Sequence, residues 1–101
     1  WIGFSATNQI QYNAGICGMA VVKASIKFVS FEPLLQPIHP EGAYGLSELD
    51  WVIIGSQTQP VRHPKREWVE EIIQVADKEN IPIFVKEPLA SHFNIIRQEY
   101  P

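Results

Sequence analysis

Residues 28–35 read FVSFEPLL, an apolar and β-branched run that stops abruptly at a glutamate followed by a proline. A second stretch, residues 81–89 (IPIFVKEPL), is built in the same way and ends in Lys86, Glu87 and Pro88 before its last leucine. Runs of this length and composition are typical of buried strands. Both stretches therefore predict a core strand that delivers charged side chains to the edge of a sheet.

Strand-like and helix-like segments alternate along the whole chain. Pro64 suits the first turn of a helix with His63 before it as a cap, and Asn80 can close that helix in a left-handed turn. Alternation favours parallel strands joined by right-handed crossover helices. The fold class expected from this alternation is α/β, with four parallel strands and crossover helices. The expected strands are 1–6, 26–31, 51–56 and 81–87, the expected helices 8–23, 64–80 and 91–99, and the expected loop 36–50, with one helical turn at 46–49.

The bulk composition is that of a single globular domain covering residues 1–101. The chain is 46% hydrophobic, and its net charge of −3 comes without any Lys/Arg block, so no nucleic-acid footprint is visible. No apolar run is long enough to span a bilayer. The single cysteine, Cys17, excludes an internal disulfide and suits a reducing, cytoplasmic location. Its small apolar neighbours predict a buried thiol, and the strand-like start at Trp1 predicts a piece of a longer protein.

Polar residues follow each of the four expected strands. In parallel α/β folds, ligands bind at the carboxyl ends of the strands, where such residues gather. Ordinary structural roles compete with this interpretation, because Thr7 or Asn8 can cap a helix and Lys86 can pair with Glu32 or Glu87. The residues expected at this rim are Ser5, Thr7, Asn8, Ser30, Glu32, Ser56, Gln57, Thr58, Lys86 and Glu87.

Other chemistry-bearing residues give weaker signals. The three histidines are scattered without metal-ligand spacing, so no metal site is expected. The segment 62–66 is a small basic cluster that reads as a solvated face, with a phosphate contact from Arg62 as the alternative. Neither GxGxxG nor GxxxxGK[ST] occurs, so a nucleotide-binding loop is not supported.

Four blocks carry a resemblance to a known family: WIGFSATN, KFVSFEPLL, LDWVIIGSQT and REWVEEIIQVADKENIPIFVKEPL. In order and spacing they resemble the C-terminal half of a phage-associated, radical S-adenosylmethionine-like family. The resemblance implies an incomplete TIM-type barrel whose N-terminal half carries the cysteines of a [4Fe–4S] cluster. The sequence departs from the family in having GSQT where a Gly-Gly-Glu-Ser turn is common, which leaves the role of Gln57 open.

The resemblance also implies roles for individual residues. The rest of the parent protein would supply the cluster cysteines and complete the binding site for the cofactor S-adenosylmethionine. This chain alone is therefore expected to hold no cofactor and to be inactive. The residues implied at the cofactor are Ser5, Asn8, Ser30 and Glu32, and those implied nearer the unknown substrate are Gln57, Thr58 and Lys86.

Three functional hypotheses follow. The first is one wall of the cofactor and substrate pocket of a radical S-adenosylmethionine-like protein, and the second is a small non-catalytic α/β binding or interaction domain. A third, an acid–base barrel enzyme using Glu32 and Glu87, is weaker because no histidine partner is fixed near either residue. Four strands cannot close a barrel, so the expected partner is the missing N-terminal half or a second copy in a dimer.

Overall fold

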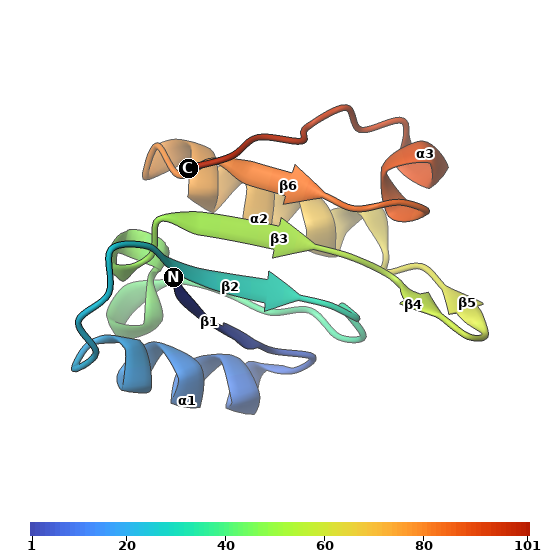
Figure 1. Cartoon of the computed structure of the whole chain (residues 1–101). Coiled ribbons are helices and arrows are strands. Elements are labelled where there is room, and N and C mark those ends of the chain that lie inside the picture. Colours follow the sequence, from blue (N-terminus) through green and yellow to red (C-terminus); the bar gives the residue numbers. More distant parts are fainter.

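A computed structural model describes all residues from 1 to 101 and contains one four-stranded parallel sheet (Figure 1). The spatial order is β1-β2-β3-β6, the same as the order along the chain. The predicted parallel α/β sheet is therefore confirmed. The strands are β1 (Ile2–Ser5), β2 (Lys27–Phe31), β3 (Trp51–Ile54) and β6 (Ile83–Val85).

Helices and short turns connect the strands (Figure 1). The helical turn expected at 46–49 is present as a 3₁₀ helix, whereas the antiparallel hairpin of β4 and β5 was not expected. None of the helices has the length and apolar character needed to cross a bilayer. The elements are α1 (Gln9–Met19), η1 (Gly42–Tyr44), η2 (Leu46–Glu48), β4 (Gln57–Thr58), β5 (Val61–Arg62), α2 (Arg66–Lys78) and α3 (Leu89–Phe93).

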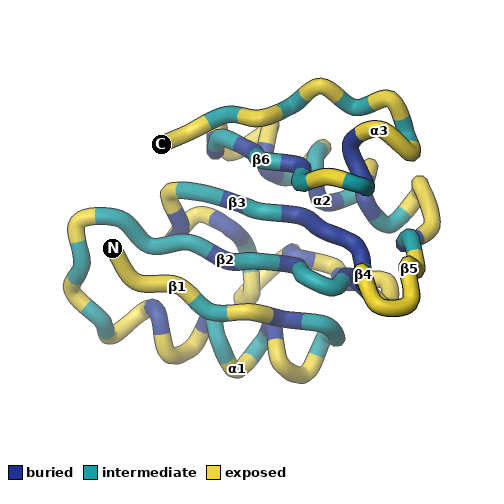
Figure 2. Tube along the Cα trace, turned by 45° about the vertical axis from the view of Figure 1, so that its right-hand side comes forward, coloured by how far each residue is buried: buried dark blue, intermediate teal, exposed yellow.

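Both long helices cover the same face of the sheet. Right-handed crossovers that always step in one direction place their helices on one face. Accordingly, alternate strand residues are fully buried beneath α1 and α2 in a single core, while their neighbours on the other face stay half-buried (Figure 2). We call this second side the open face. The strand residues buried in the core are Val29, Phe31, Val52, Ile54, Ile83 and Val85.

The helix boundaries follow local chemistry. The side chain of Asn8 caps α1 by accepting a hydrogen bond from the Gln11 amide at 2.9 Å. The helix α2 starts at Arg66 rather than at Pro64, and Lys65, not His63, is its N-cap residue. Asn80 adopts φ 57°, which confirms the predicted left-handed turn.

The cysteine prediction is wrong. Cys17 is exposed, because the buried stripe of α1 consists of Tyr12, Ile16 and Met19 and the thiol lies on another side of the helix. Gly15 is where α1 approaches the sheet, since a Cβ atom there would come within 2.1 Å of the Phe4 ring.

The helix predicted over 91–99 is also wrong. The helix α3 stops at Phe93, Asn94 takes a left-handed conformation with φ 56°, and the chain then runs antiparallel to β6. The Val85 amide donates to the Arg97 carbonyl and the Glu99 amide donates to the Ile83 carbonyl, both at 2.8 Å. Pairing with β6 satisfies backbone groups that a strand edge leaves free.

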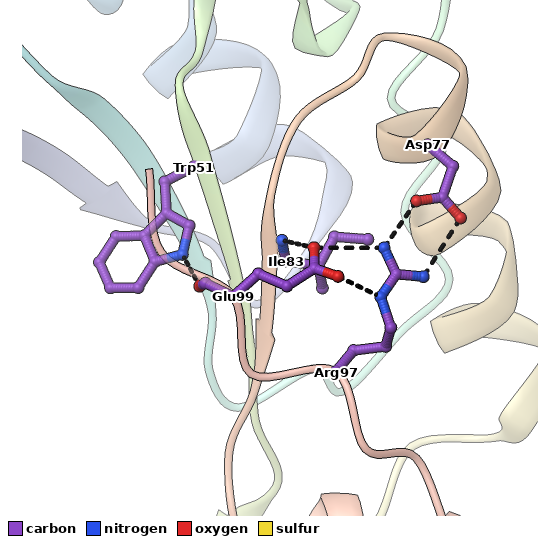
Figure 3. A network of polar contacts seen from close by, with 5 residues as sticks. All are labelled: Trp51, Asp77, Ile83, Arg97 and Glu99. Atoms are coloured by element: carbon purple, nitrogen blue, oxygen red, sulfur yellow. Dashed lines mark hydrogen bonds and ion pairs between the residues drawn. The ribbon is translucent and has the colours of Figure 1, made fainter.

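Side chains fasten this C-terminal tail, residues 94–101 (Figure 3). Arg97 lies 2.7 Å from a carboxylate oxygen of Asp77 on α2 and 2.7 Å from one of Glu99. The Trp51 indole donates to the Glu99 backbone carbonyl at 2.8 Å, and the Ile83 amide donates to the Glu99 side-chain carboxylate at 3.0 Å. The β6 edge is therefore covered, whereas the β1 edge is free.

Candidate functional site

The open face carries side chains in levels that follow the strand register. Gly3, Phe28 and Trp51 are in register, and the Phe28 ring lies over Gly3, where a Cβ atom would come within 2.4 Å of it. The next level toward the carboxyl ends of the strands consists of Ser5, Ser30, Ile53 and Phe84. The level beyond the strand ends consists of Glu32, Gly55 and Lys86.

Aromatic rings form the lower part of the open face. The Trp51 ring centroid lies 5.7 Å from that of Phe28, 6.3 Å from that of Phe84 and 5.8 Å from that of Tyr100 in the tail. Trp1 adds a fifth ring at 6.0 Å in an edge-on contact. These spacings are those of favourable aromatic pairs, so the rings stabilise one another on a face that no helix covers.

An ion pair crosses the upper end of the open face. The Lys86 ammonium lies 2.8 Å from a carboxylate oxygen of Glu32, so Glu32 is the one of its two expected partners, Glu32 and Glu87, with which Lys86 pairs. It crosses β3 above Gly55, where a Cβ atom would come within 3.0 Å of the Glu32 carboxylate. The Ser30 hydroxyl donates to the same carboxylate at 3.5 Å. Both charged side chains remain partly exposed and can therefore reach a ligand.

The ion pair and the aromatic rings together enclose a hollow of about 190 Å³, which we call the open-face hollow. A larger hollow of about 420 Å³ lies at the opposite end of the sheet, beside Asp50 and Pro82. Ligands of parallel α/β folds bind at the carboxyl ends of the strands, so the smaller hollow is the candidate site. Its lining residues are Glu32, Trp51, Ile53, Phe84, Lys86 and Tyr100.

The structure brings together only part of the residue set predicted from the sequence. Ser5 lies in register with Ser30 on the open face, next to the level of the ion pair. Asn8 does not join them, because its side chain is committed to capping α1. Gln57 and Thr58 lie in the β4–β5 hairpin, where the Gln57 amide nitrogen donates to the Pro60 carbonyl at 3.1 Å.

Two further rim residues have structural roles. The Glu87 carboxylate accepts a hydrogen bond from the Ser91 hydroxyl in α3 and does not pair with Lys86. The Ser56 hydroxyl is buried and bonded to the His63 ring at 2.8 Å. Sequence reasoning missed Trp51, Phe84 and Tyr100. Trp51 and Phe84 could have been found from the sequence, because they alternate with the buried strand residues Val52, Ile83 and Val85.

No group in the chain fits a metal or an iron–sulfur cluster. No set of three His, Cys, Asp or Glu side chains is close enough to hold an ion. A [4Fe–4S] cluster needs several cysteine thiolates, and Cys17 is the sole cysteine. The groups that the open-face hollow offers a ligand are one carboxylate, one ammonium, the Tyr100 hydroxyl and aromatic rings.

Comparison with known proteins identifies a family. A family model described as "Protein of unknown function (DUF5131)" matches residues 1–92. No curated protein and no solved structure matches the chain significantly.

Proposed function

The chain belongs to the DUF5131 family of proteins of unknown function, and we propose that it forms one wall of a cofactor and substrate pocket in a larger protein. In this proposal, residues 1–101 are the C-terminal part of a radical S-adenosylmethionine-like, phage-associated protein that acts in the reducing cytoplasm. The observation that carries the proposal is the Glu32–Lys86 pair above aromatic rings on a sheet face that no helix covers.

The topology supports an incomplete TIM-type barrel. Strands in sequential order, with both crossover helices on one face, are the arrangement of a barrel wall, whereas doubly wound sheets carry helices on both faces. The tail covers the β6 edge, so further strands would add at β1. The open face would then line the barrel interior, where ligands of such folds approach the strand ends.

The open-face side chains suit a ligand with charged and planar parts. Lys86 can bind a carboxylate and Glu32 an ammonium group, while the Ser5 and Ser30 hydroxyls can donate or accept hydrogen bonds. The Trp51 and Tyr100 rings can pack against a planar base. S-adenosylmethionine has an amino-acid end and an adenine ring and matches this set. Its cluster would need thiolates from the rest of the parent protein, so the chain alone is proposed to be inactive.

Amide NMR on the isolated chain tests this proposal. Titration with S-adenosylmethionine at millimolar concentration is expected to shift the amide signals of Ser30, Gly55 and Lys86. Glu32→Gln is expected to abolish these shifts, whereas Glu41→Gln, a change at an exposed carboxylate outside the hollow, is expected to retain them. Shifts confined to other surfaces, or none at all, would contradict the proposal.

The second candidate function is a non-catalytic interaction domain. The free β1 edge favours it, because an open edge pairs readily with another chain and because Trp1 and Ile2, at the start of this edge strand, are among the exposed apolar residues. Under this proposal, a strand of the missing half or a second copy in a dimer adds at β1.

Sedimentation of the purified chain tests edge pairing. Trp1→Lys places a charge beside the free edge and is expected to weaken the dimer. Val21→Lys changes a residue that is 85% exposed beyond α1 and is expected to leave association unchanged. A wild-type chain that stays monomeric at micromolar concentration argues against pairing between copies.

A further inference from the structure

A second hollow lies beside the first turn of α2 and shares no residue with the open-face hollow. Its volume is about 300 Å³, and we call it the hairpin hollow because the β4–β5 hairpin forms one side. The segment that follows β2 forms another side, and α2 contributes an aromatic ring. The residues that line it are Leu34, Leu35, Gln57, Arg62, His63 and Trp68.

The charge at the hairpin hollow is positive and uncompensated. No acidic residue lines the hollow, and the Arg62 guanidinium makes no ion pair or hydrogen bond within the chain. Lys65 stands nearby, 5.8 Å from the Trp68 ring centroid, and is also without a carboxylate partner. Arg66 differs, because it pairs with Glu70 and donates to a backbone carbonyl. The unpaired cation of Arg62 is therefore available to a ligand.

His63 supplies a second donor. The Ser56 hydroxyl is buried, and its hydrogen-bond partner is the Nδ1 atom of His63 at 2.8 Å. A buried hydroxyl needs an acceptor for its proton, so Nδ1 accepts and the proton of the neutral ring is on Nε2. The His92 ring stacks on His63 at a centroid distance of 3.8 Å and fixes its plane. Burial, followed by the charge of His92, lowers the pKa of His63, which favours this neutral form.

We propose that the hairpin hollow binds an oxyanion carried on an apolar body, with the anion on Arg62 and the His63 Nε2–H. Guanidinium groups bind phosphate and carboxylate oxygens in pairs, and a ring N–H adds a further donor. The apolar body packs against Leu34, Leu35 and the Trp68 ring, which are the nonpolar part of the lining. Neither a bare anion nor a neutral apolar molecule uses both halves of this surface.

Titration of the chain with four probes, followed by amide and indole NMR, tests this proposal. Phenyl phosphate and benzoate carry an oxyanion on a ring, inorganic phosphate has no apolar body, and benzyl alcohol has no charge. The ring-bearing anions are expected to bind more tightly than the other two probes and to shift the Trp68 indole signal. The tighter of phenyl phosphate and benzoate identifies the anionic group.

Matched variants separate the site from general charge attraction. Arg62→Gln removes a charge-assisted hydrogen bond and is expected to weaken binding about tenfold. Lys23→Gln removes an exposed cation outside the hollow and is expected to change nothing. Equal weakening by both variants, an unmoved Trp68 indole, or equal affinity for phosphate with and without the ring would overturn the proposal. The amide spectrum of each variant shows directly that it is folded.

Discussion

Replacing Arg97 by methionine is expected to loosen the C-terminal tail from the sheet. The change removes the contacts to Asp77 and Glu99, both at 2.7 Å, and keeps the apolar stem of the side chain. Exposed ion pairs are worth about 0.2–1 kcal/mol each, and these carboxylates are about half exposed, so the two together contribute about 1 kcal/mol. For a domain of this size, that loss lowers the melting temperature by about 4–8 °C.

The loss should depend on pH in a defined direction. Hydrogen bonds from Arg97 hold the pKa values of Asp77 and Glu99 below their usual range. A carboxylate with a lowered folded-state pKa stabilises the fold above its unfolded pKa, and this contribution disappears as the pH falls through the folded value. The stability difference between wild type and Arg97→Met is therefore largest near about pH 7 and vanishes in acid below both carboxyl pKa values.

Urea unfolding at about pH 7 and in acid below both carboxyl pKa values, combined with amide hydrogen exchange, measures this effect. The Glu99 amide, which donates to the Ile83 carbonyl, is expected to exchange faster in the variant, while amides at the β2–β3 pairing keep their protection. Asp77→Asn provides a matched comparison, because it removes one of the two pairs and should lose about half as much. An equal stability difference at neutral and acid pH would refute the electrostatic reasoning.

Four further substitutions test the packing. Gly18→Ala is expected to stabilise the chain by about 0.5–1 kcal/mol, since a Cβ atom there meets no atom within 4 Å. Gly15→Ala is expected to destabilise the chain, because the new methyl group meets the Phe4 ring. Thermal melts of both variants test these two expectations. Tyr12→Phe loses the partly buried hydrogen bond of 2.6 Å from the Tyr12 hydroxyl to the Tyr44 carbonyl and is expected to cost about 1 kcal/mol in urea unfolding. Gly55→Ala is expected to displace the open-face ion pair, seen as an altered lysine ammonium signal by NMR.

The four strands of the parallel sheet could be predicted because each one is mostly apolar, but the C-terminal tail could not. Residues 91–99 are locally compatible with a helix, and the decisive features are the left-handed turn at Asn94 and pairing with a strand distant in the fold. The exposure of the Cys17 thiol likewise could not be predicted from its sequence neighbours. Its neighbours are small and apolar, yet the rotation of α1 decides exposure, and three other residues of that helix occupy the core.

The residues of the candidate site could also be predicted only in part. Glu32 and Lys86 could be predicted as neighbours because parallel strands bring their carboxyl ends to one edge. Their contact across β3 also depends on Gly55, which leaves room for the carboxylate and which strand-end reasoning does not single out. Asn8 and Gln57 occupy equivalent places in the sequence but make local hydrogen bonds instead. Local capping and hairpin pairing thus compete with ligand binding for the same polar residues.

The tail links the stability of the fold to the candidate site. Residues 97 and 99 fasten it to α2 and β6, and the next residue, Tyr100, forms part of the open-face hollow and packs 5.8 Å from the Trp51 ring centroid. A tail released by Arg97→Met would carry Tyr100 away from the hollow as well as uncover the β6 edge. A ligand seated against Tyr100 favours the attached tail, so it should restore protection to the Glu99 amide in that variant. Edge protection and ligand binding therefore rest on the same eight-residue segment.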